Sequence, residues 1–210
     1  MAHHRPFQVI GYHGCDRKIG LGVLNGDLQL KPSTNKWDWL GHGVYFWEQN
    51  PKRALTYAIE AASKTQHHSG NIETPFVIGA IIELNTCLNL IEPESIEVLK
   101  EAYNGLARIY REAGQVMPTN RDAVRKLDNA VFKHLHESRK GNPLLEYDTV
   151  RCAFAEGEEV YPGANFTARL HIELCVLNPK CYRGFFLPLP HEDYNPYLKA
   201  EFNPPIDLKG

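Results

Sequence analysis

Residues 37–48 have the sequence WDWLGHGVYFWE and are followed at once by a helix start. Five aromatic residues and two glycines fall within these twelve positions. A buried strand explains Phe46 and Trp47, but it does not explain glycines on both sides of His42. Glycines beside aromatic side chains suit a flat ring that stacks close to the backbone, as in a nucleotide or nicotinamide pocket. This segment is therefore the first candidate for a binding site.

Upstream of this segment, residues 7–12 (FQVIGY) predict a strand that ends abruptly at His13-Gly14. Residues 20–36 hold four Gly or Pro residues among polar ones, which predicts mostly loop with a short strand at 28–30. His13 has two interpretations. It is a polar strand end followed by a turn glycine, or it donates a directed hydrogen bond to a ligand that the glycine allows to approach.

Downstream, Asn50 is suited to cap a helix and Pro51 to occupy its first position. Residues 76–84 (FVIGAIIEL) are apolar and rich in β-branched residues, which predicts a strand buried on both faces, with a buried helix as the alternative. Residues 93–113 and 120–140 place apolar residues at spacings of three and four, so each predicts an amphipathic helix. Together they are expected to form a helical hairpin inserted at about residues 92–141.

The sequence of the last third of the chain predicts mainly β-strands. Residues 148–155 and 169–177 alternate in polarity, with a loop expected at 156–166, and residues 181–187 are a candidate partner strand. In the second of these strands, alternation places Glu173 on the face opposite the apolar one. The proline-rich tail at 188–210 is expected to be irregular and peripheral. This order of elements predicts one α+β domain over residues 1–210 with a largely antiparallel core.

Composition excludes several classes of protein. The chain has 210 residues, 43% hydrophobic and 23% charged, with a formal net charge of −2, which argues against disordered, collagen-like, coiled-coil and nucleic-acid-coating proteins. Apolar runs stay far below the length of a membrane span, so no membrane contact is expected. The N-terminus lacks the apolar region of a secretory signal, and the five scattered cysteines indicate reduced thiols in the cytoplasm. Phosphate-loop and metal-binding motifs are missing, so no metal is expected.

Three motifs, taken in order, resemble a known family. Tyr12-His13-Gly14, then Gly41-His42-Gly43-Val44-Tyr45-Phe46, then the strand at 170–178 with Glu173, are similar to the NAD⁺-dependent ADP-ribosyltransferases. The branch is that of diphtheria toxin and the poly(ADP-ribose) polymerases, whose first strand carries His-Gly and whose later segment is Gly-x-Gly-[Ile/Val]-Tyr-Phe. An acidic residue on a late strand completes the set. The resemblance covers roughly residues 8–187.

The resemblance implies antiparallel sheets that are split around a cleft for NAD⁺. It also implies that NAD⁺ binds there as a substrate. It implies that His13, Tyr45 and Glu173 are the catalytic set, with Tyr45 stacked on nicotinamide and Glu173 serving the nicotinamide ribose. The positions of a small hydroxyl residue and a tyrosine on the following helix fall on Arg53 and Thr56, and Tyr57 is one residue out of register. The residues expected to bind the dinucleotide are therefore His13, Gly14, Gly43, Tyr45, Arg53 and Tyr57.

Glu173 also has a physical rationale. Nicotinamide leaves as a neutral molecule and needs no general acid, whereas the oxocarbenium-like ribose that forms needs stabilisation. A carboxylate on a rigid strand, bonded to a ribose hydroxyl, supplies it. The competing interpretation is a solvated strand residue. Glu156, Glu158 and Glu159, in the expected loop, are rival acids and candidates for contact with the acceptor.

These observations predict a mono-ADP-ribosyltransferase that modifies a protein or nucleic acid and releases nicotinamide, with a toxin, a defence effector and a housekeeping enzyme as the open alternatives for its role. Polymer elongation is not expected, because His42 replaces a lysine common in the polymerases. One alternative is an NAD⁺ glycohydrolase or an RNA 2′-phosphotransferase-like enzyme. The other is a non-catalytic module that binds ADP-ribose or a partner. The helical hairpin is a solvated surface in its simplest interpretation, with nucleic acid or a neutralising protein partner as alternatives.

Overall fold

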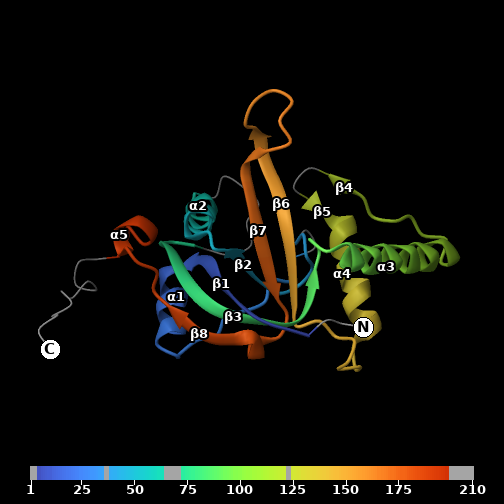
Figure 1. Ribbon diagram of the computed structural model, residues 1–210, viewed down its shortest axis with the longest axis horizontal. Helices are drawn as coiled ribbons and strands as arrows, with labels where there is room; N and C mark the ends of the chain where they lie inside the picture. The colour runs from blue at the N-terminus through green and yellow to red at the C-terminus, as the bar shows by residue number, and fades with distance from the viewer. Residues whose placement is uncertain (1–3, 36–37, 64–71, 122–123, 199–210) are drawn as a thin grey trace, which may run out of the picture.

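The protein is an α+β structure built on a mostly antiparallel sheet (Figure 1). The computed structural model describes residues 4–35, 38–63, 72–121 and 124–198. Their elements are, in order, β1 (His4–Asp16), α1 (Arg17–Leu24), β2 (Val44–Glu48), α2 (Pro51–Ala62), β3 (Pro75–Asn89), α3 (Pro93–Glu112), β4 (Asn120–Arg121), β5 (Val124–Arg125), α4 (Lys126–Arg139), β6 (Thr149–Glu159), β7 (Thr167–Val176), β8 (Tyr182–Phe186) and α5 (His191–Tyr194).

The main sheet has the strand order β1-β2-β7-β6-β3-β8, and β1 pairs with β3 as well. The pairings therefore close a circuit through β1, β2, β7, β6 and β3. Every contact in it is antiparallel except the short β3–β6 pairing. The side chains inside the circuit form an apolar core that includes Val9, Phe46, Ile82, Leu174 and Val176. Figure 1 shows α3 and α4 on one side of the strands and α1, α2 and α5 on the other.

Helix α2 lies directly against β1. Its buried face consists of Ala54, Ala58 and Ala61, so the helix backbone approaches the strand closely. A Cβ atom added to Gly14 would lie 2.3 Å from the carbonyl oxygen of Ala54, which leaves room for glycine alone. The Asn50 side chain accepts a hydrogen bond from the Arg53 amide at 3.0 Å, as predicted for the N-cap of this helix.

The amphipathic helical pair is confirmed, with a different boundary. Helix α3 matches the expected range, but α4 begins at Lys126, and residues 120–121 and 124–125 form the small β4–β5 pairing instead. The Asn120 side-chain oxygen accepts from the amides of Leu127 and Asp128 at 2.9 and 3.2 Å. The first turn of α4 is therefore capped by a residue outside the helix, which periodicity does not reveal.

The N-terminal expectations need two corrections. Strand β1 does not end at His13-Gly14 but continues to Asp16, because the long strand β3 offers pairing partners as far as Pro75. The expected loop at 20–36 begins with helix α1, and residues 28–30 form no strand. A Cβ atom at Gly20 would lie 2.2 Å from the Phe76 ring, so close packing overrides the low helix propensity of glycine.

The C-terminal expectations also change. The strand predicted at 76–84 is buried on both faces at its start, as expected, and β8 pairs with β3. Strand β6 runs through the first part of the expected loop at 156–166. In the tail, Asn195 is buried and bonds both the amide and the carbonyl of Val77, so it is not peripheral. Residues 199–210 lie outside the described residues.

Candidate functional site

Strand register brings two of the three expected catalytic residues to one side of the sheet. Tyr45 pairs with Cys175, Trp47 pairs with Glu173, and Tyr12 pairs with Trp47. Because directly paired residues point to the same side of a sheet, Tyr12, Tyr45, Trp47 and Glu173 share one face. We call this side of β2 and β7 the outer face. Helix α2 covers it at Trp47, and the helical pair covers it near Tyr45.

His13 is placed differently. It follows Tyr12 on β1, so its side chain points to the other side, where its ring lies 5.5 Å from that of Phe46. Strand β1 pairs with β2 at Gly11 and Tyr12. At His13 the imidazole ring, and not the backbone, contacts β2. Its Nδ1 lies 2.7 Å from the Tyr45 carbonyl oxygen. The structure thus joins His13 to the backbone of Tyr45, but not to the face that carries the Tyr45 and Glu173 side chains.

This contact defines the protonation of His13. A carbonyl oxygen only accepts, so Nδ1–H donates to Tyr45 and the neutral ring has Nε2 as an acceptor. Burial lowers the pKa of His13, and the bond to the Tyr45 carbonyl opposes that shift only in part. A neutral His13 therefore offers a ligand an acceptor. The donor expected from the sequence is already used within the protein.

The Tyr45 hydroxyl stabilises the turn that precedes β2 through two hydrogen bonds. Its hydroxyl donates to the Gly41 carbonyl at 2.6 Å and accepts from the Leu40 amide at 3.0 Å. Gly41 has a φ of +82°, a conformation that favours glycine. A Cβ atom at Gly43 would lie 2.3 Å from the Cys175 sulfur. Packing therefore accounts for both glycines, and contact of Gly43 with a dinucleotide stays a prediction.

Glu173 lies beside a second histidine. Its Oε1 is 3.2 Å from Nε2 of His171, whose Nδ1 is 2.7 Å from the Arg169 carbonyl oxygen. The side chain of His171 is 1% exposed and that of Glu173 is 13% exposed. Burial favours a neutral His171, but the hydrogen bonds to Glu173 and to the Arg169 carbonyl outweigh it and raise the pKa. The carboxylate is thus held at Oε1, and the Glu173 side chain keeps a small exposed fraction.

Helix α2 contributes two side chains next to Trp47. The Arg53 guanidinium lies 5.3 Å from the centre of the Trp47 ring, and its Nη2 is 3.0 Å from a carboxylate oxygen of Glu156. The Tyr57 ring lies 5.0 Å from that of Trp47. Thr56 is exposed and bonds the helix backbone. Of the two helix positions considered from the sequence, Tyr57 is therefore the one that faces the strands.

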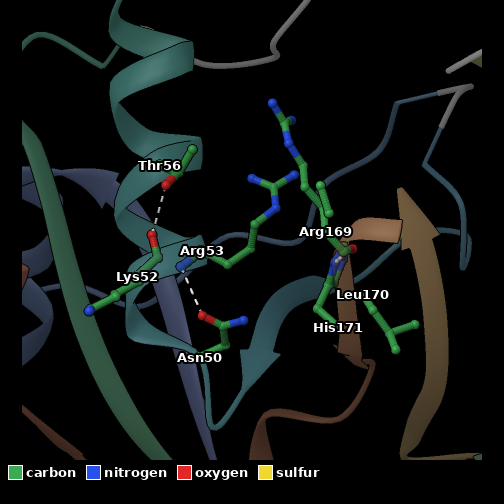
Figure 2. A pocket seen from close by; sticks show the side chains of 8 residues that line it. Asn50, Lys52, Arg53, Thr56, Arg169, Leu170 and His171 are labelled. Carbon is green, nitrogen blue, oxygen red and sulfur yellow. Dashed lines mark hydrogen bonds between the residues drawn. The ribbon is translucent and has the colours of Figure 1, made fainter. Parts of the chain in front are cut away.

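A shallow pocket of about 240 Å³ lies between the start of α2 and β7 (Figure 2). Figure 2 shows Arg53 and Arg169 extending over it from the helix and from the strand. Both arginines form ion pairs with Glu60, at 3.8 and 3.4 Å. Such a cation-rich pocket suits an anionic group, and its volume suits part of a dinucleotide. The pocket is lined by Asn50, Lys52, Arg53, Thr56, Ala168, Arg169, Leu170 and His171.

The three rival acids belong to β6 and not to a loop. Glu156 is held by Arg53 beside the site. Glu159 accepts a hydrogen bond from the Gly163 amide and stabilises the hairpin turn, while Glu158 is exposed. The strands continue past the expected boundary because Gly157, with a φ of +82°, accommodates an irregularity in the pairing. Only Glu156 therefore adjoins Glu173 and its neighbours.

Sequence reasoning overlooked His171 and Arg169. Both lie on the polar side of the alternating strand together with Glu173, two and four residues before it. Residues two apart on a strand share a face, so that spacing already contained the signal. Trp37, part of the aromatic segment, lies outside the described residues.

Comparisons with known proteins add no relative. No protein-family model, curated protein or solved structure matches this chain significantly. Within the described ranges, no three His, Cys, Asp or Glu side chains gather as metal ligands would. In the same part of the chain, no helix combines the length and the apolar character needed to cross a membrane.

Proposed function

We propose that this protein is a mono-ADP-ribosyltransferase, which transfers ADP-ribose from NAD⁺ to a macromolecular acceptor and releases nicotinamide. The observation that carries the proposal is the position of Glu173. Glu173 lies on the outer face, where it is paired across the strands with Trp47, two residues along from the Tyr45–Cys175 pair. Glu173 and Tyr45 are two of the three residues that the resemblance to ADP-ribosyltransferases assigns to the reaction.

Glu173 is suited to stabilising a positively charged ribose. Strand β7 is hydrogen-bonded to β2 on one side and to β6 on the other, so the carboxylate sits on a rigid support. As the bond between nicotinamide and ribose breaks, positive charge develops on the ribose, and a carboxylate bonded to a ribose hydroxyl stabilises that charge. The partly exposed Glu173 has a free side for this hydroxyl.

The surroundings fit the other parts of NAD⁺. Lys52, Arg53 and Arg169 in the pocket between α2 and β7 complement the charge of a pyrophosphate.

The test is nicotinamide release from NAD⁺ labelled in its nicotinamide ring, with purified protein and a cell extract as the source of acceptor. We expect Glu173→Gln to lower the rate by about 10² to 10³-fold, the usual effect of removing one such electrostatic contact. Glu112→Gln, at the exposed end of α3, is the matched control and should retain full activity.

The products separate the candidate functions. Label from the ADP-ribose part on a macromolecule supports the transferase, whereas free ADP-ribose alone identifies a glycohydrolase. Binding of NAD⁺ in calorimetry without consumption identifies a binding module. Undiminished activity of the Glu173→Gln variant removes Glu173 from its assigned role.

A further inference from the structure

We propose that His171 is the positioning residue of this site: as an imidazolium ring it ties the Glu173 carboxylate to the backbone of β7. The catalytic consequence rests on the proposed function, but the pairing of the two side chains does not. His171 itself touches no reacting atom in this assignment. It acts through Glu173, whose orientation toward the ribose it determines.

The hydrogen-bond geometry requires two protons on the ring. Nδ1 lies 2.7 Å from the Arg169 carbonyl oxygen, and Nε2 lies 3.2 Å from a carboxylate oxygen of Glu173. Both neighbours are acceptors, because a carbonyl carries no proton and a carboxylate is ordinarily less basic than imidazole. A neutral ring has one N–H and satisfies one of them. Only the imidazolium form donates to both.

Packing prevents the ring from escaping this arrangement. The side chain is 1% exposed, and the ring of Phe154, its partner on β6, lies 6.1 Å away. A buried imidazolium is costly unless negative charge compensates it. Glu173 and Glu156 supply that charge and favour the protonated form.

The remaining charged and titratable neighbours act in both directions. Cations at the pocket oppose protonation of His171, and carboxylates favour it. On β7 and β6 these neighbours are Arg169, Glu173, Cys152 and Glu156. Lys52 and Arg53 on α2 line the pocket that His171 also lines, and Glu60 pairs with Arg53 and Arg169. Tyr45 and Tyr57 interact with Glu173, and Asp38 interacts with both tyrosines.

The pairing makes the site sensitive to pH. Below the pKa of His171 the ring donates to Glu173 and holds it. Above that pKa, Nε2 has lost its proton and its lone pair faces the carboxylate. The contact is then repulsive, and Glu173 is released. The pKa of His171 is raised above the ordinary value for histidine. We therefore expect the rate of nicotinamide release to fall when the pH rises above this raised pKa.

Two amide variants separate the two hydrogen bonds. In His171→Gln the amide nitrogen takes the place of Nε2 and still donates to Glu173. In His171→Asn it takes the place of Nδ1 and donates to the Arg169 carbonyl alone. We expect His171→Asn to lower kcat by about 10 to 100-fold, as loss of a supporting contact typically does, with KM for NAD⁺ little changed. His171→Gln should keep most of the activity and lose the alkaline fall.

The outcomes that overturn the proposal are equally specific. It is wrong if His171→Asn is as active as the unaltered protein at every pH, or if His171→Gln keeps the same alkaline fall. Melting temperatures of both variants show whether they fold. Should His171→Asn fail to fold, the pH profile of His171→Gln decides.

An NMR titration separates this proposal from the proposed function. The ring nitrogens of His171 are followed against pH in the full protein and in Glu173→Gln. We expect the pKa of His171 to fall in the variant, because the carboxylate that favours the protonated ring is gone, whether or not NAD⁺ is consumed. An unchanged pKa overturns the pairing, while absence of nicotinamide release with an intact pairing overturns the transferase function alone.

Discussion

At the scale of single residues, His136 shows how a buried histidine links stability to pH. It lies in the helical pair, between the rings of Phe132 and Tyr147, and its Nε2 is buried without a hydrogen-bond partner among the described residues. Burial, with a smaller contribution from Arg139, lowers its pKa to about 4. The unfolded chain therefore binds a proton between the ordinary histidine range and about pH 4, where the folded protein does not.

The free energy of unfolding should consequently fall as the pH is lowered through this range. Above the ordinary pKa of histidine, the contribution of His136 to stability is fully present. We expect the free energy of unfolding to decrease by about 3 kcal/mol on this account, at about 1.4 kcal/mol for each pKa unit. Urea unfolding of the unaltered protein and of His136→Phe, measured from pH 7 to pH 4, tests it. The variant should show the weaker pH dependence. Equal slopes would mean that His136 titrates alike in both states.

Individual site residues differ in how far the sequence predicted them. Alternation of polarity placed Glu173 on the face opposite Leu174, and the strand register confirms this, because Leu174 pairs with Phe46 in the core whereas Glu173 pairs with Trp47. The family pattern without a gap falls on Thr56, but Tyr57 was the residue expected to bind the dinucleotide, and Tyr57 is the one that faces the strands. Its contact with NAD⁺ stays a prediction. The partner of His13 was not predictable, because the Tyr45 carbonyl becomes available only where two strands from distant parts of the chain separate.

At the scale of elements, the contact of α2 with β1 depends on Gly14. An alanine at this position brings its Cβ against the backbone of Ala54, so the helix has to shift as a unit. We expect Gly14→Ala to lower the free energy of unfolding by about 1 to 3 kcal/mol, as overpacking does. Nicotinamide release should fall too, because α2 carries Arg53 and Tyr57.

Gly184 on β8 provides the matched control, since a Cβ atom added there meets nothing within 4 Å. Gly184→Ala should change stability by less than about 0.5 kcal/mol. Urea unfolding of the two variants makes the comparison. Equal stability of both would contradict the close approach of α2 to β1.

Elements were predictable where one periodicity ran without interruption. Helix α3 and strand β7 follow this rule, whereas the strand within β3 was predicted from a continuous apolar run rich in β-branched residues. Helix α1 was missed because its glycines signal a loop, whereas the packing of Gly20 against Phe76 requires a glycine within the helix. The start of α4 was misplaced because a side chain outside the helix, that of Asn120, caps it.

At the scale of the whole molecule, the sheet brings together segments far apart in sequence. Residue pairs such as Trp47–Glu173 and Arg53–Glu156 span more than one hundred positions, and such pairs are created by strand order. The sequence predicted an α+β domain with a mostly antiparallel core, which is confirmed. It did not predict the closed circuit of pairings, because local patterns carry no information on which strands become neighbours.

We propose that the outer face around Glu173 binds NAD⁺ for reaction, and a crystal structure of the protein with a non-hydrolysable NAD⁺ analogue is the test. We expect the nicotinamide-like ring beside Tyr45 and a hydroxyl of the adjoining ribose within about 2.6–3.2 Å of a Glu173 oxygen. An analogue bound elsewhere, or bound with Glu173 out of reach of the ribose, would contradict it.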